Sequence, residues 1–186
     1  TIDDLKAMEY ELCEYLGFGK IIEKTYAEWQ NHYGLAEDYE MTAEEETQMM
    51  NEFGQTMITE FPEMTSPFWN MSRNGDGTSR KIDVILGGME TIGSAERSTD
   101  VDQMRETFHT ITEGAYSSLL FDLFSKDRVQ GELEEFLQHD FFPRVGGGIG
   151  MTRMIAALDK LNVGSIPTPI DSSMGLIQKG SSMMAL

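Results

Sequence analysis

The segment KIDVILGGMETIGSAERS, residues 81–98, constrains the fold of this chain more than any other stretch, because it predicts a β-hairpin. Apolar side chains alternate from Ile82 to Leu86, as in a strand with one buried face. Gly87 and Gly88 follow, and two consecutive glycines favour a tight two-residue reversal. Residues 89–97 then return as the partner strand. The segment therefore predicts an antiparallel strand pair.

This hairpin brings two acidic side chains together. With Gly87 and Gly88 as the turn, Ile85 faces Glu90, and Asp83 shares the face of Ile85 because side chains alternate along a strand. Asp83 and Glu90 are then diagonal neighbours whose side chains start about 7 Å apart. Two carboxylates on an open sheet face are typical of a Mg²⁺ site that leaves room for water and phosphates. The alternative is a pair of ordinary solvated carboxylates.

Arg97 lies seven residues after Glu90, which in a regular strand would place it on the opposite face. A β-bulge at Gly93 would return Arg97 to the face that carries the carboxylates. There its guanidinium could donate a fork of hydrogen bonds to a carboxylate or an amide oxygen. The alternative is a surface ion pair of little energetic value.

The remaining sequence predicts helices on both sides of a group of strands. Helical periodicity or capping signals mark residues 2–17, 20–32, 42–53, a stretch capped by Thr99, 119–124, 129–137 and 151–161. Met104, Phe108 and Ile111 are the predicted buried stripe of the Thr99 helix. Strand-like composition marks residues 55–61, 66–72 and 79–86. This order predicts an α+β fold, with a mainly antiparallel sheet flanked by helices. We expect one domain over residues 1–162 and a loosely ordered tail over 163–186.

A glycine-rich stretch precedes the last predicted helix, in FFPRVGGGIGMTRMIAALDKL, residues 141–161. It does not match the dinucleotide-binding pattern, which would require glycine where Met151 stands, nor a P-loop, which requires Gly-Lys-Ser/Thr. One interpretation is a connector or close packing between a strand and a helix. The other is the close approach of a planar or phosphate-bearing ligand, which Arg153 in the first helical turn would meet.

Composition limits the possible partners. The net charge is −18, so the chain offers few cations for nonspecific binding to nucleic-acid phosphates. Cys13 is the sole cysteine of the sequence, which excludes an internal disulfide framework and fits a reducing, cytoplasmic setting. No apolar run in the sequence is long enough to span a membrane, and no secretory signal is visible in it.

Taken together, these segments resemble a known family. GGGIGMTRM resembles motif 3 of the class II aminoacyl-tRNA synthetases, a Gly-x-Gly-x-x-Arg pattern that opens a helix. The order of TEFPEMTSPFWNMSRNGDG, then KIDVILGGMETIGSAER, then the glycine stretch resembles the aspartyl/asparaginyl subgroup, including its asparagine-synthetase-like paralogues. The resemblance covers about residues 55–161. It implies the C-terminal part of a class II catalytic core.

The resemblance assigns roles to residues by position. Asp83 and Glu90 match the acidic pair that binds Mg²⁺ together with ATP. Gly148 and Gly150 match the motif 3 glycines, which with Glu90 belong to the ATP site. Arg153 matches the motif 3 arginine that contacts the adenine and the γ-phosphate, and it is the expected catalytic residue.

The same comparison assigns the amino-acid site. Arg97 matches the arginine that reads the side chain of bound aspartate or asparagine, and Gly93 and Ser94 belong to the same segment. Phe68 matches an aromatic residue before the turn, without a defined role. Glu96 stands where the family carries an uncharged residue, which puts the amino-acid selectivity in question.

The implied reaction is ATP-dependent activation of asparagine or aspartate to an aminoacyl-adenylate, with asparagine preferred. One alternative is an asparagine synthetase that passes aspartyl-adenylate to ammonia and needs no tRNA. Another is a non-catalytic paralogue that binds an amino acid or a nucleotide. Motifs 1 and 2 of the family are not found in the sequence, so we expect this chain to be part of a longer protein, which would be a homodimer. Its acidic charge gives no support for a tRNA partner.

Overall fold

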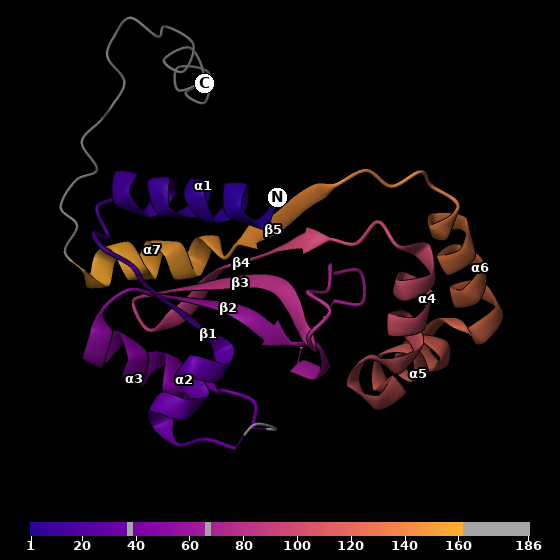
Figure 1. Ribbon diagram of the computed structural model, residues 1–186, viewed down its shortest axis with the longest axis horizontal. Coiled ribbons are helices and arrows are strands. Elements are labelled where there is room, and N and C mark those ends of the chain that lie inside the picture. The colour runs from indigo at the N-terminus through magenta and orange to yellow at the C-terminus, as the bar shows by residue number, and fades with distance from the viewer. Residues whose placement is uncertain (37–38, 66–67, 162–186) are drawn as a thin grey trace, which may run out of the picture.

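The computed structural model describes residues 1–36, 39–65 and 68–161, and its centre is a five-stranded sheet (Figure 1). The strands lie side by side in chain order: β1 (Ile22–Thr25), β2 (Thr56–Pro62), β3 (Thr78–Leu86), β4 (Met89–Arg97) and β5 (Arg144–Ile149). Strand β1 is parallel to β2, and every other neighbouring pair is antiparallel. The prediction of an α+β fold with a mainly antiparallel sheet is confirmed.

Helices cover both faces of this sheet (Figure 1). On one face, α1 (Ile2–Tyr15) and α7 (Met151–Lys160) pack on a core that includes Ile82, Val84 and Leu86. On the other face, α2 (Tyr26–Tyr33) and α3 (Ala43–Phe53) pack on a core that includes Ile85. Successive side chains of β3 thus pack into cores on opposite faces of the sheet, because side chains alternate along a strand.

A helical group lies beyond one end of the sheet (Figure 1). It consists of α4 (Val101–Thr110), the 3₁₀ turn η2 (Ile111–Gly114), α5 (Ala115–Phe124) and α6 (Lys126–Leu137), and a second 3₁₀ turn, η1 (Glu63–Thr65), follows β2. Met104, Phe108 and Ile111 are buried here, as the sequence predicts. Among the described helices, none is long and apolar enough to cross a membrane.

Three local predictions are wrong. Residues 22–25 form β1 instead of the start of a helix, because they pair with β2, and helix α2 begins only after Thr25, which caps it. Of the predicted strand over residues 66–72, two residues lie outside the described part, and Met71 pairs with Arg97 in an isolated bridge instead of a strand. The cap of α4 is Asp100 rather than Thr99, since its carboxylate accepts the N–H of Gln103.

The glycine-rich stretch is also more regular than expected. Gly146, Gly147 and Gly148 lie in β5, which pairs with β4 from residue 92 to residue 97, and Gly150 caps the helix that follows. Helix α7 begins immediately after it at Met151, as predicted. The predicted tail over residues 163–186 lies outside the described residues.

Candidate active site

The turn of the β3–β4 hairpin has the predicted form. Gly87 and Gly88 both have positive φ, 62° and 83°, which is the backbone conformation that a tight hairpin reversal needs and that glycine adopts without strain. Leu86 pairs with Met89, as the sequence predicts. The register near the turn therefore follows directly from the two glycines.

A β-bulge lies just beyond this turn. Ile85 pairs with Glu90, but Val84 pairs with Ile92, so Thr91 is the extra residue on β4. The expected bulge at Gly93 is thus found two residues earlier. The physical effect is the same, because one extra residue shifts the alternation of side chains by one position.

This bulge adds Arg97 to the face that already carries the two carboxylates. Asp83 pairs with Gly93, and Arg97 lies four residues further along β4, so the three share a face. Glu90, on the other side of Thr91, faces the same way. One irregularity in β4 thus brings the arginine to the side of the sheet where the hairpin pairing already places both carboxylates.

Asp83 is a buried carboxylate with one oxygen to spare. Its Oδ2 accepts a hydrogen bond from Lys81, and Oδ1 has no hydrogen-bond partner among the described residues. Burial raises the pKa of Asp83 to about 6; Lys81 opposes this shift, and Glu90 and Glu46 add to it. A buried oxygen without a donor, beside other carboxylates, is the environment that a bound cation would relieve.

Gly93 makes room for the two carboxylates. A Cβ at this position would lie 2.6 Å from Oε1 of Glu90 and 3.5 Å from Oδ1 of Asp83. A side chain here would therefore force Glu90 Oε1 to move and would touch Asp83 Oδ1, so both carboxylate oxygens lie over the glycine backbone. No cluster of three or more potential metal-ligating side chains occurs in the described residues. Two carboxylates would leave the remaining Mg²⁺ positions to water and phosphate, so the residues present fit that ion.

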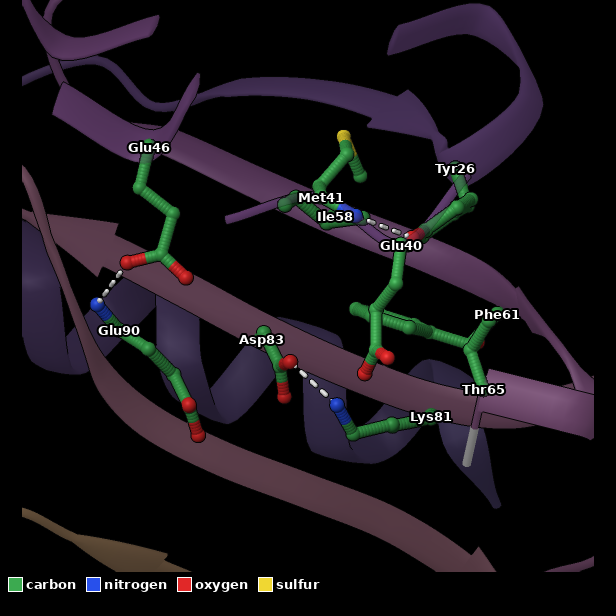
Figure 2. A pocket seen from close by; sticks show the side chains of 10 residues that line it. All are labelled: Tyr26, Glu40, Met41, Glu46, Ile58, Phe61, Thr65, Lys81, Asp83 and Glu90. Carbon is green, nitrogen blue, oxygen red and sulfur yellow. Dashed lines mark hydrogen bonds and ion pairs between the residues drawn. The ribbon is translucent and has the colours of Figure 1, made fainter. Parts of the chain in front are cut away.

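Two cavities meet at these carboxylates. One has a volume of about 210 Å³, and its lining includes Glu40, Glu46, Asp83, Glu90 and Lys81 (Figure 2). A second cavity, of about 280 Å³, shares Asp83, Glu90 and Lys81 with the first. Its further lining residues are Phe68, Met71, Gly93, Ser94, Arg97 and Gly148. Every residue predicted for the amino-acid site therefore borders this second cavity.

Arg97 is held in place by contacts that, among the described residues, occupy only part of its guanidinium. Nη1 donates to Oδ1 of Asn70 and Nη2 to the carbonyl oxygen of Gly146, each at 3.2 Å. The guanidinium carbon lies 5.2 Å from the ring centroid of Phe68, which gives this aromatic residue a stacking role. Burial, and then Arg144, lower the pKa of Arg97, but a guanidinium stays charged. A fixed cation with spare donors is suited to reading a side-chain oxygen.

Ser94 and Glu96 face the other side of the sheet. The Ser94 hydroxyl donates to Oε1 of Glu9 on α1 at 2.5 Å, so only the rest of this residue can border the cavity. Glu96 accepts hydrogen bonds from Arg80 and from the N–H of Ile2, both at 2.7 Å. The predicted effect of Glu96 on selectivity is therefore not a direct contact on the Arg97 face.

Adjacent glycines of β5 satisfy both interpretations of the glycine stretch. A Cβ on Gly147 would lie 2.5 Å from Cβ of Ser94 and 2.6 Å from the carbonyl oxygen of Gly93, so close strand packing requires glycine there. Gly148 pairs with Gly93 on the opposite pleat, and a Cβ there would meet nothing within 4 Å. The backbone at Gly148 is therefore open to a ligand in the cavity.

Helix α7 brings Arg153 to Glu90. Gly150 is the N-cap of this helix, and its N–H donates to the carbonyl oxygen of Thr91 at 2.9 Å, which ties the helix to the bulge. Arg153 Nη1 donates to the carbonyl oxygen of Glu90 at 2.8 Å and lies 3.8 Å from its Oε2. The Arg153 side chain is 56% exposed, so it can also contact a ligand anion.

Sequence reasoning missed Lys81 and Glu46. Lys81 lies two residues before Asp83, so strand alternation could have placed both on one face. Glu46 lies on α3 and accepts the N–H of Glu90 at 3.0 Å, a contact between segments 44 residues apart that no local pattern signals. Both residues line the cavity of Figure 2.

The buried Glu9 behind the site predicts a pH-dependent stability. Its side chain is 3% exposed, and burial raises its pKa from 4.5 to about 7. Between these values the folded chain holds a proton that the unfolded chain releases, so stability falls as the pH rises, by roughly 3 kcal/mol in total from this group. Glu9→Gln should remove most of that fall.

Urea unfolding at about pH 5 and pH 8 measures this effect. The wild-type chain should lose more stability between the two conditions than Glu9→Gln does. Glu11→Gln, a change of the same kind at an exposed position of α1, is the matched control and should behave as the wild type. Equal losses in the wild type and Glu9→Gln would show that Glu9 is not protonated in the folded chain.

Comparison with known proteins supports the fold. The family model described as tRNA synthetases class II (D, K and N) matches residues 6–165. An aspartyl tRNA synthetase from Entamoeba histolytica superposes with a TM-score of 0.57 at 16% identity, over 78% of this chain and 31% of that chain. An asparaginyl-tRNA synthetase from Pyrococcus horikoshii complexed with asparaginyl-adenylate has a TM-score of 0.57 at 17% identity, over 77% and 32%. An Entamoeba histolytica asparaginyl-tRNA synthetase in complex with asparaginyl-adenylate has a TM-score of 0.57 at 17% identity, over 84% of this chain and 37% of that chain.

At these sequence identities, the structural matches establish the fold alone. The chain spans about a third of the length of each of these proteins. A search of curated protein sequences finds no match. The family model and the structures agree with the resemblance to a class II core of the aspartyl and asparaginyl kind, which is thereby confirmed. The chain belongs to the class II tRNA synthetase family of the D, K and N type.

Proposed function

We propose that this chain carries ATP- and amino-acid-binding parts of an enzyme that activates asparagine or aspartate as an aminoacyl-adenylate, with asparagine preferred. The observation that carries the proposal is the arrangement around Gly93. The carboxylates of Asp83 and Glu90 meet above it, Arg97 lies on the same face, and Arg153 touches Glu90. The complete reaction is assigned to the full-length protein.

The nucleotide would lie against β5 and the start of α7. Asp83 and Glu90 would hold Mg²⁺, which would supply positive charge for the triphosphate. Gly148 would allow the nucleotide to approach the backbone, and Gly150 begins the helix that carries Arg153. With its guanidinium half exposed, Arg153 would contact the phosphates and stack on the adenine.

The amino acid would occupy the cavity that contains Arg97. Asparagine and aspartate both present a side-chain oxygen, which can accept a hydrogen bond from this arginine. Gly93 and Ser94 would border the substrate through their backbone. The fold is shared equally with aspartyl- and asparaginyl-tRNA synthetases, so the preference for asparagine rests on the resemblance of the sequence motifs to the asparaginyl branch.

In the proposed reaction, a carboxylate oxygen of the amino acid attacks the α-phosphorus of ATP. The bond between this phosphorus and the oxygen that bridges to the β-phosphate breaks, so pyrophosphate leaves and the adenylate remains. The attacking carboxylate is already ionised at neutral pH, so the chain needs no general base. Arg153 stabilises the negative charge of the phosphates.

Titration calorimetry of the chain with ATP tests the nucleotide part of this proposal. ATP should bind in the presence of Mg²⁺ and bind far more weakly when a chelator removes the metal ion. Arg153→Ala should weaken the Mg²⁺-dependent binding, while Arg128→Ala, an exposed helical arginine of α6, should leave it unchanged. ATP binding that depends neither on Mg²⁺ nor on Arg153 would overturn the assignment of these residues to a nucleotide site.

A second candidate is an aspartate–ammonia ligase built on the same core. The net charge of −18 disfavours tRNA, and the four carboxylates of the cavity in Figure 2 would favour an ammonium ion. Free asparagine formed from aspartate, ammonia and ATP would support this candidate, and asparagine-dependent adenylate formation would support the tRNA ligase.

The main proposal also includes that the full-length protein is a homodimer in the cytoplasm. Sedimentation of the purified protein would test the dimer, and a fluorescent fusion in cells would test the location.

A further inference from the structure

Lys81 is a cation built into the proposed metal site. It lies on β3, two residues before Asp83 and on the same face, and its ammonium donates a hydrogen bond to Oδ2 of Asp83. The same nitrogen lies 3.8 Å from the ring centroid of Phe61 on β2. With a side chain that is only 11% exposed, Lys81 is held between an aromatic face and a carboxylate (Figure 2).

This ammonium uses the same carboxylate that a divalent cation would need. Of the two oxygens of Asp83, Lys81 takes Oδ2, and Oδ1 has no partner among the described residues. Glu90 has a longer ion pair, with Arg153 Nη1 3.8 Å from its Oε2. Lys81 therefore holds one of the two expected metal ligands in a close ion pair, whereas the cation beside the other lies further away.

The Lys81 ammonium would repel a divalent cation bound at Asp83. A divalent cation bound to Oδ1 of Asp83 would lie within a few ångströms of the Lys81 ammonium, because both would contact the same carboxylate. Like charges at that separation repel strongly in a partly buried site. The packing of Lys81 against Phe61 resists its movement away. The additional carboxylates of Glu40 and Glu46 in the cavity leave a surplus of negative charge, so the cation would still bind, but weakly.

We propose that Lys81 acts as a resident counter-ion of the Asp83–Glu90 site. It competes with the divalent cation and keeps the affinity of the site for that cation low when no nucleotide is bound. This inference rests on the proposed function, because it assumes the metal site at Asp83 and Glu90. Its consequence is that the metal ion enters together with the triphosphate, whose charge outweighs that of Lys81.

Binding of Mn²⁺ to the chain without nucleotide tests this role directly. Electron paramagnetic resonance at about pH 8 reports free Mn²⁺, and this pH lies above the Asp83 pKa of about 6. Lys81→Met should bind Mn²⁺ at least tenfold more tightly than the wild type, since one positive charge beside the ion is removed. Lys81→Gln, which keeps an N–H donor for Asp83, should change the affinity in the same direction and serves if the methionine variant does not fold.

Lys24→Met is the matched control. Lys24 lies on β1 with its ammonium 4.7 Å from the Trp29 ring centroid, so the variant removes the same charge and the same type of aromatic contact away from the cavities. It should bind Mn²⁺ as the wild type does. Lys81 variants that bind no more tightly than the wild type, while Asp83→Asn abolishes binding, would overturn the competition but leave the metal site standing. Failure of the wild type and both Lys81 variants to bind Mn²⁺ at millimolar concentration would overturn the competition together with the metal site.

Discussion

Asp83→Asn is expected to reduce amino-acid activation by about a thousandfold or more, because it removes a charged ligand from the proposed metal site. The replacement amide has the same shape, so the loss should come from charge and not from packing. An amide oxygen is a weaker ligand than a carboxylate, and the Lys81 ammonium beside it would then be uncompensated. Both effects repel a cation from this position.

Two measurements separate this loss from unfolding. Asp83→Asn should show the circular dichroism spectrum of the wild type but should lose the Mg²⁺-dependent binding of ATP. Asp159→Asn, the same substitution at an exposed position of α7, should retain it. Full activity of the Asp83 variant would rule out this carboxylate as a metal ligand.

Arg97→Ala is expected to raise the KM for the amino acid by about a hundredfold or more, with little change in the KM for ATP. A charge-assisted pair of hydrogen bonds to the substrate is lost, and the neighbouring guanidinium of Arg144 is held by the carbonyl oxygens of Ser98 and Phe142. Arg97→Lys should recover little of the affinity, because a single ammonium nitrogen that bonds to Asn70 and Gly146 leaves no planar pair of donors for the substrate.

Arg144→Ala is the matched control for this prediction. Arg144 pairs with Arg97 in the β4–β5 register, but its own hydrogen bonds run to the carbonyl oxygens of Ser98 and Phe142. Its removal should leave the KM of the amino acid nearly unchanged. If Arg97→Ala weakened ATP and amino-acid binding equally, Arg97 would not be the residue that reads the substrate side chain.

Local patterns were sufficient to predict the hairpin and the face of Asp83. The alternation from Ile82 to Leu86 and the two turn glycines determine which residues pair near the turn. The position of the bulge was not predictable in this way. Thr91 is held out of register by its hydroxyl, which donates to the carbonyl oxygen of Met89, and by its own carbonyl oxygen, which accepts the N–H of Gly150. The sequence of β4 alone does not encode the contact with Gly150.

Contacts between distant segments account for the other errors. Strand β1 has only four residues and exists because it pairs in parallel with β2, so its sequence reads equally well as the start of a helix. The glycines of β5 were not predicted as a strand, although Gly147 is fixed by contact with Ser94 on the next strand. Glu46 reaches the site from α3, which only the tertiary structure brings near Glu90.

Exchange of labelled pyrophosphate into ATP tests the central claim most directly. The full-length protein should be incubated with ATP and Mg²⁺ and, in separate reactions, with asparagine, aspartate, lysine or no amino acid. Lysine is the informative comparison because the family model spans the D, K and N enzymes. We expect exchange with asparagine, or more weakly with aspartate, and none with lysine. Exchange with lysine alone, or no exchange with either asparagine or aspartate, would contradict the proposed activation of these two amino acids.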